Sequence, residues 1–147
     1  MICRRTLTSF CLILLTLCLL ISCQAEKQKG TTLDQLAPAN ADEAEIYAIV
    51  GKLQDRISAS EWDKWLELYT DDAVLTSGKK EINKQQMRDL IEGISYKIND
   101  MAVLDKNISG EKASVSVSFN GNGKKQYETY LLTKKSGQWL IYQEKNP

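Results

Sequence analysis

The side chains that could do chemistry in this sequence are carboxylates and phenols, because the commoner catalytic groups are missing. The chain contains no histidine, and its four cysteines, Cys3, Cys11, Cys18 and Cys23, all precede residue 24. The usual general acid or base at neutral pH and the usual ligand of zinc or iron are therefore lacking. After residue 23 we expect no disulfide, no thiolate nucleophile, no metal and no cofactor.

Glu128 is the best single candidate for a buried acid. It lies two residues before Tyr130 in a β-prone segment, so the two side chains share one face of a strand. A carboxyl group beside a phenol can donate a proton to a small molecule or accept one from it. A solvated or ion-paired glutamate is the commoner outcome, and the sequence therefore favours a domain without catalytic activity.

Aromatic and acidic residues ahead of this segment offer further candidates. Trp62, Trp65 and Tyr69 lie at helical spacing and could line a pocket for a flat ligand, although packing of a helix on a sheet is favoured. Asp71 and Asp72 could bind a cation, but acids that end a helix are the simpler interpretation.

The elements that position these residues follow a leader over residues 1–22. Arg4 and Arg5 precede an apolar run over residues 10–21, which is shorter than the roughly 20 residues of a membrane span. An uncleaved anchor over residues 6–22 is the alternative. Removal of the leader leaves 17 basic and 19 acidic residues, and this balance gives no basic footprint for nucleic acid.

The leader ends in a four-residue sequence, Leu20-Ile21-Ser22-Cys23, that resembles the lipobox of bacterial lipoproteins. The resemblance implies cleavage before Cys23 and acylation of its thiol, as with palmitate, so that lipid anchors the chain to a membrane. An ordinary secretory signal with a chance cysteine is the alternative. Gln24 is not the aspartate that retains lipoproteins at the inner membrane. In a Gram-negative cell the periplasmic side of the outer membrane is thus favoured. Residues 23–40 are predicted to form a flexible tether, with a short helical turn near 33–36.

Three helices are predicted after the tether, over residues 41–57, 60–70 and 83–93. Apolar residues recur at helical spacing in each of them, and Asn83 is placed to cap the third, with Gln86 three residues later. A short strand over residues 74–76 separates the second helix from the third.

The remaining chain alternates with period two and predicts four strands, over residues 96–104, 113–119, 126–133 and 139–144. A bulge is expected in the first strand at Asn99-Asp100. Helices must then cover one face of an antiparallel meander, which is an α+β fold.

The order of elements resembles the nuclear transport factor 2-like (NTF2-like, SnoaL-like) superfamily. The resemblance implies an NTF2-like cone over residues 41–147, with three N-terminal helices packed on a curved, mostly antiparallel sheet. It is carried by Ser60-Glu61-Trp62-Asp63, by Leu66, by Tyr69-Thr70-Asp71-Asp72-Ala73-Val74, by Gly110-Glu111-Lys112-Ala113-Ser114-Val115 and by Gly137-Gln138-Trp139.

The catalytic roles of the ketosteroid isomerase branch are mostly unfilled in this sequence. Alignment through Asp72-Ala73 places the general base at Ser77 and the oxyanion-binding tyrosine at Leu53, and the protonated acid falls near Glu128 or Thr129. The resemblance therefore implies the fold more strongly than any activity. The residues expected to line the pocket are Leu53, Trp65, Tyr69, Ser77, Glu128 and Tyr130.

Three functions remain open, all for a lipid-anchored, extracytoplasmic cell-envelope lipoprotein. The favoured one is a non-catalytic domain that binds a small apolar ligand or an envelope protein. The second is a cofactor-free isomerase, dehydratase or hydrolase that uses Glu128 and a pocket tyrosine, and the third is a structural part of an envelope or secretion assembly. A homodimer through the sheet is not indicated, because Ser114, Ser116 and Ser118 make one strand polar.

Overall fold

The computed structural model describes residues 30–146, so the leader, Cys23 and the first part of the tether lie outside the described residues. The helices are η1 (Leu33–Gln35, 3-10), α2 (Ala41–Ser58), α3 (Trp62–Leu66) and α4 (Lys84–Ile91). The strands are β1 (Thr31–Thr32), β2 (Tyr69–Ser77), β3 (Lys80–Asn83), β4 (Ile98–Ser109), β5 (Lys112–Gly121), β6 (Lys124–Lys135) and β7 (Gln138–Asn146).

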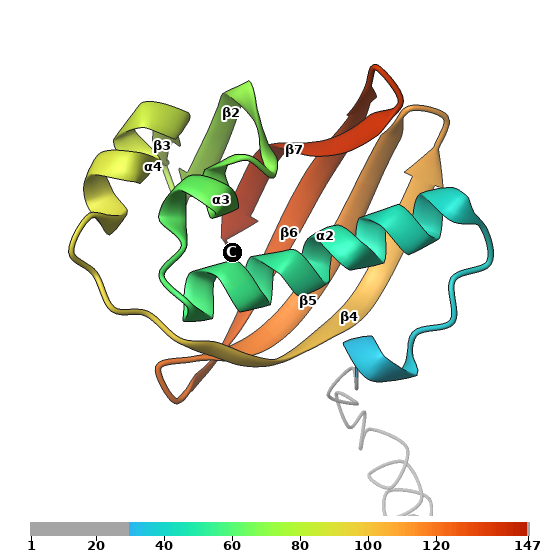
Figure 1. Cartoon of the computed structure of the whole chain (residues 1–147), viewed down its shortest axis with the longest axis horizontal. Helices are drawn as coiled ribbons and strands as arrows, with labels where there is room; N and C mark the ends of the chain where they lie inside the picture. Colours follow the sequence, from blue (N-terminus) through green and yellow to red (C-terminus); the bar gives the residue numbers. More distant parts are fainter. Residues whose placement is uncertain (1–29, 147) are drawn as a thin grey trace, which may run out of the picture.

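The strands form one sheet in the order β1-β4-β5-β6-β7-β2-β3. Neighbouring strands pair antiparallel except β2 and β7, which run parallel. Figure 1 shows α2 lying across one face of the long strands, with α3 and α4 beside its C-terminal end. The predicted α+β fold, with helices packed on a mostly antiparallel sheet, is confirmed.

The hydrophobic core lies between α2 and the sheet. Apolar side chains of α2 recur at the predicted helical spacing, and Leu53 is among those that are fully buried. On β5 the predicted alternation is also observed, because Val115 and Val117 are buried on the helical side of the sheet. Burial of these two matched faces is the main force that holds α2 on the sheet.

The second predicted helix is wrong in its length. It ends at Leu66, and β2 already begins at Tyr69, where a helix was expected to continue to residue 70. The physical reason is the pairing of β2 with β7, in which the amide of Ile141 donates to the carbonyl of Leu68 at 2.9 Å. Asp71 and Asp72 therefore lie in a strand rather than at a helix end.

Two local predictions are confirmed. Asn83 caps α4 in a capping box, in which its side chain accepts from the Gln86 amide and the Gln86 side chain accepts from the Asn83 amide. The β4–β5 register shifts between Asn99 and Ala102, and Asp100 has a φ of 55°, as the expected bulge requires. The strand β3 was not predicted.

The described part of the expected tether lies against the sheet. Thr31 and Thr32 pair with β4 as the edge strand β1, and η1 forms where a helical turn was expected. Leu33 and Leu36 pack against the core, which explains why this segment is ordered despite its polar composition. Within residues 30–146, no helix has the length and apolar character needed to cross a bilayer.

Candidate functional site

A cavity of about 220 Å³ lies between the C-terminal end of α2, the helices α3 and α4, and the sheet. Its walls are mainly aliphatic and aromatic, and two carboxyl groups of the sheet, those of Glu128 and Glu144, form its polar part. The lining residues are Ile57, Trp62, Trp65, Ile91, Ile94, Tyr96, Ile98, Glu128, Tyr130 and Glu144.

Strand pairing brings the polar part of the cavity together. Glu128 and Tyr130 are two residues apart and lie on the same face of β6. Glu144 of β7 lies directly opposite Tyr130 in the β6–β7 register. Directly opposed side chains of adjacent strands lie on the same face of a sheet. Glu128, Tyr130 and Glu144 therefore face the helices as one group.

Each glutamate accepts a hydrogen bond from a buried tyrosine. Tyr69 Oη donates to Glu144 Oε2 at 2.5 Å, and Tyr130 Oη donates to Glu128 Oε2. Burial, followed by the nearby glutamate charges, raises the pKa of Tyr69 and of Tyr130 well above the ordinary value. Both phenols consequently keep their protons and act as fixed donors.

The two carboxyl groups are unusually basic for glutamate. Burial, followed by the negative charge of Glu128, raises the pKa of Glu144 to about 8, against the hydrogen bond from Tyr69, which lowers it. Burial also raises the pKa of Glu128, against the hydrogen bond from Tyr130. Glu144 is only 6% exposed. Because its pKa is about 8, its carboxyl group carries a proton in most molecules at neutral pH.

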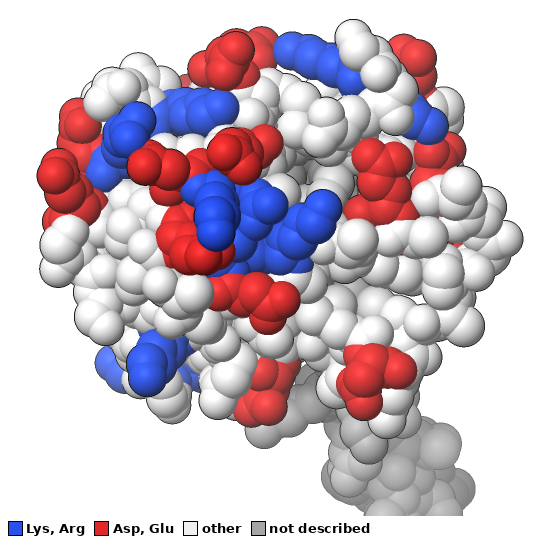
Figure 2. Space-filling view, in the orientation of Figure 1, with Lys and Arg blue, Asp and Glu red and all other residues white. Residues whose placement is uncertain are grey.

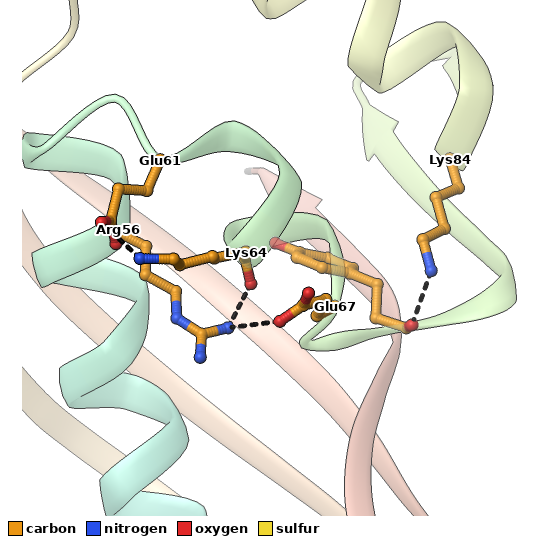
Figure 3. Close-up of polar contacts among 6 residues, drawn as sticks. Arg56, Glu61, Lys64, Glu67 and Lys84 are labelled. Atoms are coloured by element: carbon orange, nitrogen blue, oxygen red, sulfur yellow. Dashed lines mark hydrogen bonds and ion pairs between the residues drawn. The ribbon is translucent and has the colours of Figure 1, made fainter.

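Polar contacts hold the turn that carries Tyr69 into place (Figure 3). Arg56 of α2 donates to the carbonyl of Lys64 and forms an ion pair with Glu67 at 3.9 Å. Lys84 of α4 donates to the carbonyl of Tyr69 at 3.0 Å. These contacts join α2 to α3 and to Glu67, and join α4 to the start of β2.

Aromatic rings form one wall of the cavity. Trp62 and Trp65 meet edge to face with ring centroids 6.2 Å apart, and Trp65 meets Tyr69 in the same way at 5.1 Å. The indole Nε1 of Trp65 is buried and has no hydrogen-bond partner among the described residues. Such an orphaned donor is uncommon in a folded protein.

The surface around the cavity carries both signs of charge. Figure 2 shows lysine and arginine side chains interspersed with acidic ones over the helical face, and uncharged side chains between α4 and the C-terminal end of α2. Ile94, at the rim of the cavity, is 48% exposed. The entrance is therefore apolar, and this face has no basic stripe of the kind that binds nucleic acid.

The expected site residues are only partly brought together. Trp65, Glu128 and Tyr130 line the cavity, and Tyr69 reaches it through its hydrogen bond to Glu144. Leu53 lies in the hydrophobic core and is not among the lining residues. The side chain of Ser77 lies outside the part that the structure describes.

Glu144 is the acidic residue of the site that the sequence did not reveal. Trp139 and Ile141 face the helices, so strict alternation predicts that Gln143 faces them too and that Glu144 faces outward. The β6–β7 register shifts between Leu131 and Leu132, and this irregularity turns Glu144 inward. A bulge of this kind has no clear signature in the sequence of β7.

The carboxylates of residues 30–146 form no cluster suited to a metal ion, since no group of three or more potential ligands is found there. The chemistry of the cavity is thus that of two carboxyl groups and three phenols, those of Tyr69, Tyr96 and Tyr130, in apolar surroundings. Such groups can donate, accept or share protons with a bound molecule.

Comparison with known proteins identifies the fold. The sequence matches no family model and no curated protein. Among solved structures, an NTF2-like protein of unknown function from Shewanella baltica is 13% identical, with a TM-score of 0.62 over 75% of this chain and 95% of that one. A ketosteroid isomerase-like protein from Erwinia carotovora is 18% identical, with a TM-score of 0.62 over 72% and 95%.

A further match is a putative calcium/calmodulin-dependent protein kinase II association domain from Xanthomonas campestris. It is 17% identical, with a TM-score of 0.57 over 82% of this chain and 96% of that one. At these identities the similarity establishes architecture alone. The chain has the NTF2-like fold.

Proposed function

We propose that this domain binds a small, largely apolar molecule in the cavity beneath α3. The observation that carries the proposal is the cavity itself, which has apolar walls, an apolar entrance and a few converging polar groups. That combination is the usual character of a small-molecule site. A cone filled by large side chains would instead have favoured a structural role in an assembly.

The size of the cavity limits the ligand. Its volume of about 220 Å³ is below the roughly 300–1,000 Å³ of sites for drug-sized ligands. A compact molecule such as a single ring with a short polar substituent fits this space. Burial of the ring against Trp62 and Trp65 supplies the affinity, and the carboxyl groups orient the polar end.

The tryptophans provide a test with an internal control. Trp62 and Trp65 line the cavity, whereas Trp139, the third tryptophan of the chain, does not. We expect a panel of small cyclic alcohols, ketones and amines to contain compounds that shift the indole NMR signals of Trp62 and Trp65 and leave that of Trp139 unchanged.

The matched variant for this test is Ile94→Trp, which places a large ring at the exposed rim and should abolish the shifts without disturbing the core. Signals that respond equally in all three indoles, or that persist in this variant, would contradict the proposed site.

Proton-transfer catalysis is a second candidate, favoured by the different surroundings of the two carboxyl groups. Glu144, with its pKa of about 8, can donate a proton to a carbonyl oxygen, and Glu128 can accept one from the adjacent carbon. The similarity to the Erwinia protein, which is described as ketosteroid isomerase-like, is consistent with this chemistry. It predicts exchange of the α-protons of a cyclic ketone with solvent deuterium, which Glu128→Gln should abolish. Exchange at the uncatalysed rate would eliminate this candidate.

We also propose that the domain is displayed outside the cytoplasm on a lipid anchor at Cys23, where it binds its small molecule or an envelope partner. The support is the leader and the lipobox-like sequence that ends at Cys23. Mass spectrometry of the mature protein should find an acylated cysteine at the N-terminus. A Cys23→Ser variant that matures identically and stays with the same membranes would refute the anchor.

A further inference from the structure

We infer that the ligand of this cavity is a small organic ammonium ion, with its nitrogen at Glu128 and Glu144 and its apolar body against Trp62 and Trp65. This inference rests on the proposed function, because it names the chemical class of the molecule that the cavity holds. Three observations support it, and none of them depends on the others.

The first observation is that the acid pair, Glu128 and Glu144, has no basic partner among the described residues. Ion pairs within residues 30–146 all involve other acidic residues, and no lysine or arginine lines the cavity. Glu128 and Glu144 are nevertheless close enough for the charge of one to act on the other. A buried carboxyl group is normally paired with a cation or keeps its proton, as Glu144 does, so a cationic ligand can take the place of that proton.

The second observation is that the carboxyl group of Glu144 is open toward the cavity. Its Oε2 atom accepts from Tyr69, but no described residue donates to Oε1. The fully enclosed side-chain atoms without partners are those of Trp65, Thr70 and Asn146, so Glu144 Oε1 is not sealed inside the protein. Because Glu144 lines the cavity and is otherwise buried, this oxygen is placed to accept from a bound N–H group.

The third observation is the aromatic wall. Trp62, Trp65 and Tyr96 all contribute to the lining of the cavity that Glu128 and Glu144 also line. The electron-rich face of tryptophan attracts an organic cation, most strongly where water is excluded. A neutral ligand would gain the same apolar contact but not this attraction.

A metal ion would not be held equally well. Calcium and magnesium require six or more oxygen ligands, and the cavity offers two carboxyl groups among aliphatic and aromatic side chains. An ammonium group requires only two or three acceptors, and its carbon substituents match the apolar walls. The site is therefore suited to an amine rather than to an inorganic cation.

An ammonium ligand predicts a specific pH dependence of its own affinity, because its binding is linked to the ionisation of Glu144. Among the described residues, the titratable groups around Glu144 are Glu128 and Tyr130 of β6 and Tyr69 at the start of β2. Tyr96, which precedes β4, lines the same cavity near Glu128. Binding of a cation favours the ionised form of Glu144, so the complex releases a proton where the free protein is still protonated. The affinity for an ammonium ion should then rise between about pH 6 and about pH 9, over the interval in which Glu144 ionises.

Benzylamine and benzyl alcohol are suitable probes, because they share size and ring and differ mainly in charge. We expect benzylamine to bind the purified full chain about tenfold more tightly than benzyl alcohol, by calorimetry and by the Trp62 and Trp65 indole signals. Only benzylamine should bind more tightly as the pH rises. The variant Glu144→Gln should remove this preference and its pH dependence, whereas Glu92→Gln, an exposed residue after α4, should retain both.

Each outcome decides between the two proposals. If benzyl alcohol binds as tightly as benzylamine, the cavity is a ligand site but the ammonium inference is overturned. If neither probe shifts the Trp62 and Trp65 signals, both proposals fall together. If Glu92→Gln weakens benzylamine binding as much as Glu144→Gln does, the attraction is a general surface effect and the inference is also overturned.

Discussion

The two ends of α2 differ in whether the buried tryptophan and the carboxyl group found there have polar partners. At the closed end, defined by Asp42, Lys134 and Trp139, a buried tryptophan donates from Nε1 to Asp42 at 3.0 Å, and Lys134 pairs with the same carboxylate at 2.6 Å. At the open end, defined by the cavity, Trp65 donates to no described residue, and no lysine or arginine within residues 30–146 pairs with Glu144.

The pKa shifts express the same contrast. The hydrogen bonds from Lys134 and Trp139 lower the pKa of Asp42, whereas burial raises the pKa of Glu144 to about 8. A carboxyl group that stabilises the fold is expected to have a lowered pKa, as Asp42 has. A carboxyl group that lowers stability when it ionises has a raised pKa, as Glu144 has. The open end therefore has the character of a functional site, and the closed end that of a structural one.

The largest expected effect is the loss of packing at the closed end. Trp139 is 1% exposed, so Trp139→Ala should lower the free energy of unfolding by about 3–5 kcal/mol. Trp62 is only partly buried at the cavity wall, and Trp62→Ala should cost at most about 1–2 kcal/mol. Urea unfolding followed by circular dichroism measures both values. Equal losses would show that the two ends contribute alike to stability.

The second effect is the pH dependence that Glu144 confers. Its pKa is about 8 in the folded protein and near the ordinary glutamate value of 4.5 in the unfolded chain, so the folded state binds the extra proton between these values. Stability is then fully present below about pH 4.5 and falls by up to ~1.4 kcal/mol for each pH unit until about pH 8. Urea unfolding across this range measures the slope.

Glu144→Gln is the matched variant for that slope, because glutamine can still accept from Tyr69. It should flatten the pH dependence and make the protein more stable than the parent above about pH 8, with the difference vanishing in acid. A variant that is less stable at every pH would show that Glu144 is a structural residue.

The caps of two helices provide a smaller and more local contrast. Asn40 caps α2 by accepting from the Glu43 amide, and Asn83 caps α4, which borders the cavity. Either change to alanine should cost about 1 kcal/mol. Asn40→Ala should lower global stability, since α2 buries much of the core. In Asn83→Ala the loss should instead appear as faster amide exchange within α4, about fivefold, because only Met87 of that helix is buried. Uniformly faster exchange would contradict this division.

Sequence reasoning predicted the parts of the molecule that local pattern determines. The helical spacing of α2, the capping box at Asn83 and the alternation of β5 each specify their element through neighbours a few residues away. The same reasoning placed Glu128 and Tyr130 on one face of a strand, because they are two residues apart.

Contacts between distant segments decided the rest. The helical pattern through Tyr69 was overridden by parallel pairing of β2 with β7, which no local propensity reports. The inward position of Glu144 depends on a register shift between β6 and β7, and its hydrogen bond to Tyr69 joins residues 75 apart in the sequence. Glu144 could therefore not be predicted from the sequence, because its position depends on how β6 and β7 pair.

The smallest effect we expect has the opposite sign to that of Glu144→Gln. Asp42→Asn leaves an oxygen that can accept from Trp139 Nε1 and removes only the charge that pairs with Lys134 on the surface. Because the folded-state pKa of Asp42 is lowered, its ionised form stabilises the protein at neutral pH, and that contribution disappears as the pH falls through the folded value. Chemical unfolding should find this variant slightly less stable than the parent at neutral pH and equal to it in strong acid. The same replacement of carboxylate by amide would thus weaken the closed end and strengthen the open end. If both variants changed stability in the same direction, the difference in role between Asp42 and Glu144 would be lost.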